Sequence, residues 1–453
     1  MTAIHAAQAL LPQGWASDVT VSLGPDGRIS AVTPDSAAPA DAVRVGVLLP
    51  APANTHSHAF QRAMAGLTER RGQGSDSFWT WRTLMYRFVD VITPEQLQAI
   101  AAFVQMEMLE AGFGASVEFH YLHHTPDGTP HDDIAEMSAR IAAAAGQSGI
   151  GLTLLPVMYQ YGGCDRRPLA GGQLRFGNDL DRFGRLVDGA RRALSALPDA
   201  RLGVAPHSLR AVAAQDFAAL AALTDGPIHL HLAEQQPEVD EVLAAYGARP
   251  VEWALANLDL SPRWCPIHIT QMLPHETEAL AATGAVAGLC PLTEASLGDG
   301  IFDGVRWLGA GGAISVGSDS NIRISLAEEL RQLETSQRLR DHSRAALATP
   351  EQSTGRRMFQ AVAEGGAQAA GRDSGAIRPG ALGDLLALDM SHPDLDELAG
   401  DTILDSFAMA GGSDMVGEVW SGGRHVVRDG RHVRRHEIEA AYRTAVRSLR
   451  AAA

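Results

Sequence analysis

Short apolar runs that alternate with longer helical stretches are the feature that most constrains how this chain folds. Between Leu48 and Ser320 the sequence contains eight candidate strands, at residues 48–58, 115–121, 151–159, 201–209, 228–234, 266–272, 285–291 and 313–320. Helix-like stretches such as TPEQLQAIAAFVQMEMLEAG and PEVDEVLAAYG separate them. This alternation is typical of a parallel sheet, and eight strands are the number that closes a (β/α)8 barrel. An open doubly wound sheet is the alternative, but no glycine-rich phosphate loop follows an early strand.

The two ends of the chain have a different pattern, in which β-like runs are broken by turn residues. Residues 1–47 contain DVTVSLGPDGRISAV, and residues 377–435 contain IRPGALGDLLALD and WSGGRHVVRDGRHV. We therefore expect an α/β protein with one small β-sandwich domain built from both chain ends, 1–47 and 377–435. The barrel, residues 48–376, is inserted between them, and residues 436–453 are expected to form a C-terminal surface helix.

Charge and hydropathy restrict the partners. The net charge of −16 argues against nucleic acid as a partner, and an anionic substrate would need a locally basic pocket. The N-terminal segment lacks a signal-peptide pattern, and no apolar stretch reaches the roughly 18 residues that a membrane span needs. The three cysteines, Cys164, Cys265 and Cys290, are odd in number and widely spaced, which favours reduced thiols. We expect a cytoplasmic protein without a membrane partner.

Two histidines one residue apart, His56 and His58, end the first candidate strand. In a strand, side chains at positions i and i+2 point to the same face, so the two imidazoles would converge. A pair of neutral imidazoles suits a zinc-like cation that other residues complete. Two solvated polar residues in a loop are the simpler interpretation of the pair alone.

Polar residues also end several later strands. His207 follows the fourth strand, His231 and Glu234 the fifth, His268 the sixth and Asp319 the eighth. Each has an ordinary structural explanation when taken alone; Asp319, for example, could cap the next helix. Catalytic groups of such barrels lie at the carboxyl ends of the strands, however, and the set as a whole predicts a metal-dependent hydrolase.

This arrangement resembles the amidohydrolase superfamily over essentially the whole chain. The resemblance implies His56, His58, His231 and Asp319 as metal ligands, with His268 beside the reacting water. The two-metal class of that superfamily usually has a carboxylated lysine at strand four, but RLGVAPHSL contains none. One divalent ion is therefore expected, with zinc as the conservative choice and iron or manganese as alternatives.

The fifth strand leaves an ambiguity, because His229 and His231 in HLHLAEQ have the same parity. His231 lies nearer the strand end and alone has the His-x-x-Glu spacing to Glu234 that is found in the deaminase branch. We assign the ligand to His231 and expect His229 to be a buried, hydrogen-bonded histidine.

These groups predict a reaction. A divalent cation lowers the pKa of bound water towards neutrality. Asp319 can accept the water proton, His268 can orient the nucleophile and stabilise its charge, and Glu234 can protonate a departing nitrogen. The expected catalytic residues are Glu234, His268 and Asp319, acting on an amidine-like carbon with loss of ammonia.

The segments SHAFQRAMAG, DSFWTWR and APHSLRAV resemble the formimidoylglutamate deiminase family. The resemblance implies hydrolysis of N-formimino-L-glutamate to N-formyl-L-glutamate and ammonia in histidine degradation, by a homodimer. It also implies that Arg82 and Arg210 bind the two substrate carboxylates, since guanidinium groups bind carboxylates through two hydrogen bonds. Gln61 and Tyr121 would add hydrogen bonds, and His207 would contact the substrate near the metal.

Alternatives stay open at this point. Arg82 could form a surface ion pair, and Trp79 and Trp81 could belong to the core. The chain has Asn321 where the family pattern favours histidine, and Arg323 could add a cation, so fine specificity could differ. A deaminase for a guanine- or adenosine-type heterocycle is the nearest rival, and a non-catalytic barrel scaffold is a weaker one.

Overall fold

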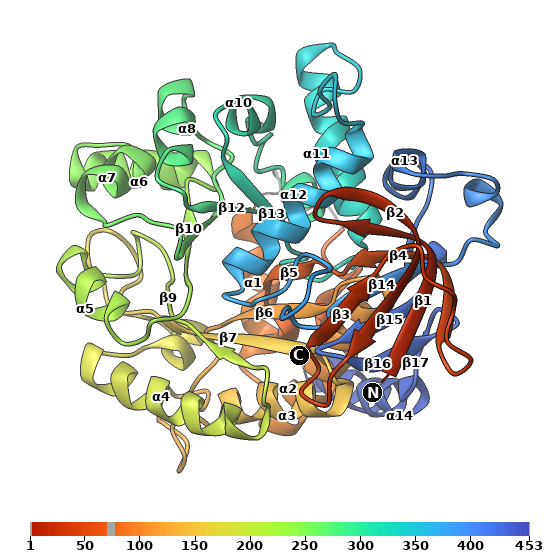
Figure 1. The fold of residues 1–453 in the computed structure, drawn as a ribbon. Helices are drawn as coiled ribbons and strands as arrows, with labels where there is room; N and C mark the ends of the chain where they lie inside the picture. Colours follow the sequence, from red (N-terminus) through yellow and green to blue (C-terminus); the bar gives the residue numbers. More distant parts are fainter. Residues whose placement is uncertain (1, 70–77, 453) are drawn as a thin grey trace.

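The protein consists of a barrel surrounded by helices, with a β-sheet at its side (Figure 1). The structure, a computed structural model, describes residues 2–69 and 78–452; in the helix that begins at Phe78, the side chains of residues 78–80, 82 and 83 are outside the description. Both described chain ends lie on the side of the molecule that carries the sheet.

Parallel strands form the barrel. They are β5 (Ala53–Ser57), β6 (Ala115–His120), β7 (Gly151–Met158), β8 (Arg201–Leu202), β9 (Ala205–Pro206), β10 (Ile228–Leu232), β11 (Trp264–His268), β12 (Val286–Leu289) and β13 (Ala313–Val316). Two groups are continuous, β5-β6-β7-β8 and β10-β11-β12-β13, and β9 pairs with β7. Single bridges, Val204–Ile228 and Ser57–Asp319, close the ring between the groups. The predicted eight-position barrel is confirmed.

Two of the expected strands are each divided into two strands in the structure. The run at 48–58 is two strands, because β4 (Val43–Pro50) pairs with the sheet at the side and only β5 enters the barrel. The run at 201–209 is divided into β8 and β9 at Gly203. A Cβ atom at Gly203 would lie 2.2 Å from the Pro227 carbonyl oxygen, so the close approach of the next segment requires glycine there.

Helices cover the outside of the barrel. They are α1 (Phe78–Val89), α2 (Pro94–Glu110), α3 (Glu136–Ser148), α4 (Leu180–Ala193), α5 (Phe217–Ala221), α6 (Gln236–Tyr246), α7 (Pro250–Asn257), α8 (Pro274–Ala281), α9 (Pro291–Leu297), α10 (Gly304–Gly309), α11 (Leu326–Asp341), α12 (Thr354–Ala369) and α13 (Asp401–Met409). Thr93 and Gln96 form a capping box at the start of α2. No helix in residues 2–69 or 78–452 is long and apolar enough to cross a membrane.

Both chain ends contribute to the sheet at the side of the barrel, as predicted. Its strands are β1 (Thr2–Leu11), β2 (Gly14–Leu23), β3 (Ile29–Thr33), β4, β14 (Leu385–Leu388), β15 (Val416–Ser421), β16 (Arg424–Arg428) and β17 (Arg431–His432), in the order β17-β16-β15-β14-β4-β1-β2-β3. Buried side chains around Trp420 and Ile4 give it a core of its own. The domain boundary after residue 47 stays a prediction, because β4 runs across it.

The last helix, α14 (Arg435–Ala452), packs against α2. Phe103 of α2 and Tyr442 of α14 stack with their ring centroids 3.9 Å apart. Ile438 and Leu449 are also buried, while the opposite face of the helix is exposed. The C-terminal helix therefore lies on the surface with one face attached to the barrel helices.

Buried ion pairs join the barrel to the sheet. Arg372, which follows α12, is fully buried between Asp199 and Asp384, with nitrogen–oxygen distances of 3.1 Å to both carboxylates. Arg424 of β16 adds a second ion pair to Asp199 at 2.9 Å. Asp199 precedes β8, so this cluster lies at the amino-terminal end of the barrel strands.

Candidate metal centre and active site

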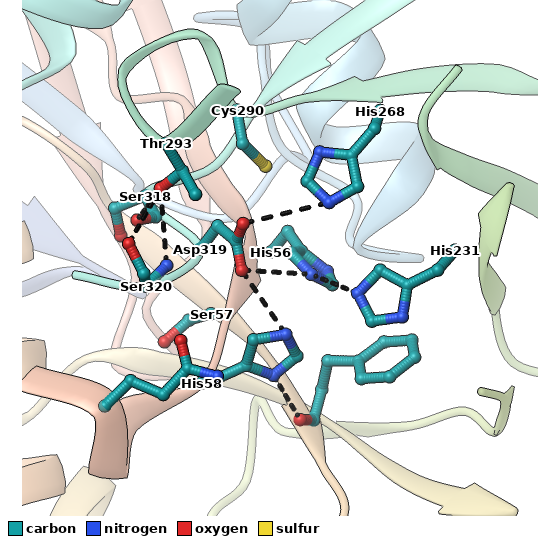
Figure 2. Close-up of polar contacts among 12 residues, drawn as sticks. His56, Ser57, His58, His231, His268, Cys290, Thr293, Ser318, Asp319 and Ser320 are labelled. Carbon is teal, nitrogen blue, oxygen red and sulfur yellow. Dashed lines mark hydrogen bonds and ion pairs between the residues drawn. The ribbon is translucent and has the colours of Figure 1, made fainter. Parts of the chain in front are cut away.

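The four expected metal ligands meet at the carboxyl ends of β5, β10 and β13 (Figure 2). His231 Nε2 lies 3.0 Å from His56 Nε2. Asp319 Oδ1 lies 3.6 Å from His56 Nε2 and 3.3 Å from His58 Nε2. All four side chains are buried. Residues more than 260 positions apart thus place four donor atoms around one point.

The spacing fits a tetrahedral cation. Metal–ligand bonds of about 2.0–2.1 Å put neighbouring ligand atoms about 3.4 Å apart in a tetrahedron, close to the distances observed. His58 Nδ1 lies 3.0 Å from the Phe119 carbonyl oxygen, and His231 Nδ1 lies 3.1 Å from that of His207. A carbonyl only accepts hydrogen bonds, so both rings carry their proton on Nδ1 and direct a lone pair from Nε2 towards the centre.

Burial keeps these imidazoles neutral, the form that binds metal. It lowers the pKa of His58 to about 3, against a smaller opposing effect of the hydrogen bond to Phe119. Burial and the neighbouring histidines lower the pKa values of His56 and His231 far below the ordinary value. Converging neutral nitrogens beside a buried carboxylate could hold one divalent ion.

Glu234 and His268 stand beside this centre. His268 Nε2 lies 3.7 Å from Glu234 Oε1 and 3.8 Å from Asp319 Oδ2. Burial, the largest influence, raises the pKa of Asp319 to about 7; Glu234 also raises it, while His268 opposes the rise. The three groups predicted to move protons are therefore within one another's reach.

Backbone strain is concentrated at this rim. Ala233, His268 and Asp319 have positive φ angles of 51°, 69° and 45° at or just beyond the ends of β10, β11 and β13. Residues other than glycine rarely adopt this left-handed conformation, and such outliers gather at functional sites. At these three positions the chain turns sharply at the rim that carries the candidate site.

A pocket opens over the centre and contains all but one of the expected substrate-binding residues. Gln61, Tyr121, His207 and Arg210 line it together with His58, His231, Glu234, His268 and Asp319. Arg82 lies on α1, and its side chain is outside the described part of the chain. Seven further lining residues were missed in the sequence: Trp81, Met85, Tyr86, Tyr159, Phe176, Leu297 and Ser320. Tyr159 and Ser320 follow strand ends and could have been found by that rule.

Two polar atoms of the pocket residues lack a hydrogen-bond partner among the residues that the structure describes. They are Arg210 Nε and Gln61 Oε1, both buried. The amide nitrogen of Gln61 donates to the Tyr121 hydroxyl over 2.8 Å, which leaves the amide oxygen unpaired. Buried polar groups are nearly always paired, so these two atoms indicate a polar ligand.

The residues that differ from the expected family pattern do not line the pocket. Asn321 is fully buried; its amide nitrogen donates to Ser57 Oγ and to the Asp319 carbonyl oxygen. Arg323 forms an exposed ion pair with Glu328. His229 is also accounted for, since its Nε2 lies 2.8 Å from the Ala369 carbonyl oxygen and it is fully buried, as we expected.

Comparisons with known proteins agree with this geometry. The amidohydrolase family matches residues 47–426, and the N-terminal domain of formimidoylglutamate deiminase HutF matches residues 1–45. A formimidoylglutamate deiminase of Pseudomonas aeruginosa is 47% identical over 95% of this chain and 96% of its own. A 5-methylthioadenosine/S-adenosylhomocysteine deaminase of Natronomonas pharaonis is 27% identical over 88% of this chain and 86% of its own.

Solved structures give the same result. An amidohydrolase from Brucella melitensis has a TM-score of 0.96 and 47% identity, covering 99% of this chain and 100% of its own. An adenosine deaminase from Xanthomonas campestris with bound zinc shares the fold, with a TM-score of 0.83 and 21% identity over 99% of this chain and 98% of its own. The chain therefore belongs to the amidohydrolase family, and within it to the formimidoylglutamate deiminases.

Proposed function

We propose that the chain hydrolyses N-formimino-L-glutamate to N-formyl-L-glutamate and ammonia, a reaction of histidine degradation. The name of the Pseudomonas relative supports this reaction, and the pocket supplies chemistry that suits the substrate. The observation that carries the proposal is the buried Arg210 beside the candidate metal centre, whose Nε lacks a partner among the described residues. A substrate carboxylate would satisfy that cation.

His56, His58, His231 and Asp319 hold one divalent ion in this proposal, and zinc is the ion we propose. Three imidazoles and one carboxylate at tetrahedral spacing are a donor set that zinc accepts. When bound, the ion supplies a Lewis acid that makes a nearby water molecule easier to deprotonate.

The protein's own groups then handle the protons. Asp319 accepts a proton from the attacking water, whose oxygen forms a bond to the formimino carbon. Glu234 donates a proton to the terminal nitrogen, the bond from carbon to that nitrogen breaks, and ammonia leaves. Glu234, ionised after it has donated its proton, then takes up the remaining hydroxyl proton, and the formyl carbonyl forms. His268, between Glu234 and Asp319, accepts a hydrogen bond from the attacking water through Nε2 and orients it.

Binding residues orient the substrate. Arg210 and Arg82 each bind one substrate carboxylate. The pocket side chains around Arg210 exclude water from its ion pair with the carboxylate. Tyr121 and Gln61 donate and accept hydrogen bonds near the entrance to the centre. His207 lies beside His231, with ring centroids 4.9 Å apart, and contacts the substrate close to the reacting carbon.

An ammonia-release assay tests the proposal. The purified, metal-loaded protein is given formiminoglutamate, guanine or S-adenosylhomocysteine. We expect turnover only with formiminoglutamate, and we expect Arg210→Met to raise KM by about 10- to 100-fold, because charged hydrogen bonds contribute about 1.5–3 kcal/mol. Activity on a purine with none on formiminoglutamate would favour the heterocycle deaminase, for which the aromatic wall of Tyr121, Tyr159 and Phe176 offers stacking surfaces.

The family resemblance also leads us to propose a homodimer in the cytoplasm. Size-exclusion chromatography with light scattering measures the first property, and a particle of one chain mass at micromolar concentration would contradict it. Cell fractionation measures the second.

A further inference from the structure

Glu294, a buried acid on α9, lies behind the catalytic centre without lining the pocket. Its Oε1 lies 3.2 Å from His268 Nδ1, on the side of the ring that faces away from Glu234 and Asp319. The proposed hydrolysis assigns no role to this carboxylate. A buried acid in contact with a catalytic histidine needs an explanation, because isolated buried carboxylates are unfavourable.

Hydrogen bonds determine which nitrogen of His268 carries the proton. A carboxylate oxygen only accepts, so the contact with Glu294 places a proton on Nδ1. In the neutral ring, Nε2 then presents its lone pair to the space between Glu234 and Asp319, where it lies 3.7 and 3.8 Å from their oxygens. The opposite tautomer would present an N–H there instead and leave Glu294 without a donor from the ring.

The carboxylate of Glu294 is itself held in place. Its Oε1 accepts a second hydrogen bond of 2.7 Å from the backbone N–H of Cys290, the residue that precedes α9. Pro291 begins the helix, so the backbone at this point is restricted. His268 in turn sits at a strained turn with φ of 69°, where the backbone alone does not determine the ring orientation.

We propose that Glu294 is a positioning residue that holds His268 in the Nδ1-protonated tautomer, with Nε2 directed at the reacting water. The proposal rests on the proposed function in so far as His268 acts on that water. Carboxylates play this part towards a catalytic or ligating histidine in other enzymes, where losing the partner costs about 10- to 100-fold in activity or metal affinity.

Two variants separate the hydrogen bond from the negative charge. Glu294→Gln keeps an oxygen that accepts from both His268 and Cys290, whereas Glu294→Leu removes the acceptor. We expect Glu294→Leu to lower kcat by about 10- to 100-fold with KM within about threefold, and Glu294→Gln to recover most of this loss. Metal content by elemental analysis should match that of the wild type in both variants. A kcat for Glu294→Leu equal to that of the wild type would overturn the proposal.

A readout without substrate tests the tautomer directly. The ring nitrogens of His268 are observed by ¹⁵N NMR in histidine-labelled protein and assigned by the signals that vanish in His268→Asn. We expect a protonated Nδ1 in the wild type and in Glu294→Gln, and a mixture of tautomers in Glu294→Leu. A wild type protonated on Nε2, either alone or together with Nδ1, would overturn the proposal even if Glu294→Leu failed to fold. If formiminoglutamate is not turned over but the ring is protonated on Nδ1, the proposed function fails and this assignment of the tautomer stands.

Discussion

The two ends of the barrel differ in whether their buried polar groups have partners among the described residues. At the amino-terminal end, Arg372 is fully buried and every carboxylate around it has a cationic partner. At the carboxyl-terminal end, Arg210 Nε and Gln61 Oε1 are buried without partners among the described residues. The first region is complete without a ligand, and the second is not.

Local backbone geometry follows the same division. Gly151 begins β7 next to Arg372, and a Cβ there would lie 2.5 Å from the guanidinium. The glycine therefore leaves the space that the Arg372 side chain occupies. At the other end, the backbone of His268 and Asp319 is strained, with positive φ angles at both residues. The comparison indicates that one end of the barrel is built for stability and the other for binding and catalysis at some cost in stability.

The largest effect should come from the catalytic end. Asp319→Asn keeps the shape of the side chain and removes the charge among the three histidines, so we expect loss of bound metal and a fall in kcat/KM of about 10⁴-fold or more, the scale seen for central catalytic groups. Elemental analysis and the ammonia assay measure both. Asp188→Asn, which changes an exposed ion pair with Arg191, is the control and should retain metal and activity.

Arg372→Met should have the largest effect on stability. It leaves Asp384 buried without its cation and Asp199 with Arg424 alone, which costs about 3–5 kcal/mol of unfolding free energy. Urea titration measures the loss. The control is Arg28→Met, which removes an exposed ion pair with Asp373 and should cost about 1 kcal/mol or less. Equal losses in the two variants would show that the division between the two ends is wrong.

Acid should weaken the amino-terminal end. Burial, the largest influence, raises the pKa of Asp199, but Arg424 and Arg372 outweigh it and hold the pKa below its ordinary value. A lowered folded-state pKa adds stability above the unfolded pKa, about 3.9, and this stability is lost as the pH falls through the folded pKa. The stability difference between wild type and Asp199→Asn should therefore be constant from pH 7 to about 5 and shrink below about pH 4.

Urea titrations from pH 7 to pH 3 measure that difference. Both proteins are first stripped of metal with a chelator, so that acid release of the ion does not contribute. A difference that grows as the pH falls would mean that Asp199 is not held ionised by the two arginines.

Arg323→Met should have the smallest effect. Arg323 pairs with Glu328 at the surface and does not line the pocket, so kcat/KM should stay within about twofold of the wild type. Arg210→Met, assayed beside it, provides the contrast with a buried arginine whose Nε lacks a partner among the described residues. A loss of activity in Arg323→Met comparable to that of Arg210→Met would make Arg323 part of the substrate site.

The clustering of the candidate metal ligands could be predicted, because residues at the carboxyl ends of parallel strands meet at one end of a barrel. Parallel barrel strands all end at the same rim, so His56, His231, His268 and Asp319 had to approach one another once the strands were recognised. The two-residue spacing of His56 and His58 added a shared direction. The prediction that Arg82 and Arg210 bind the substrate needed the family resemblance, because no periodicity distinguishes either residue from surface arginines.

Other features had no signal in the sequence. The run at 48–58 is continuous in hydropathy, and only its hydrogen-bond partners divide it between β4 and β5. Phe176 and Leu297 reach the pocket from segments after β7 and β12, whose paths depend on packing. Glu294 was missed because it lies on α9, and its partner, His268, lies 26 positions away at the end of β11.

The eight barrel positions, the rim on which the candidate site lies and the donor types follow from the amino-acid sequence alone, since each depends on local periodicity or on strand ends. The pairing of the carboxylates, the ring nitrogens that face the centre and the side chains that complete the pocket wall follow only from the three-dimensional packing. Those properties depend on distances of a few ångströms between distant segments, and such distances are set by the packing of the whole barrel rather than by any one stretch of chain.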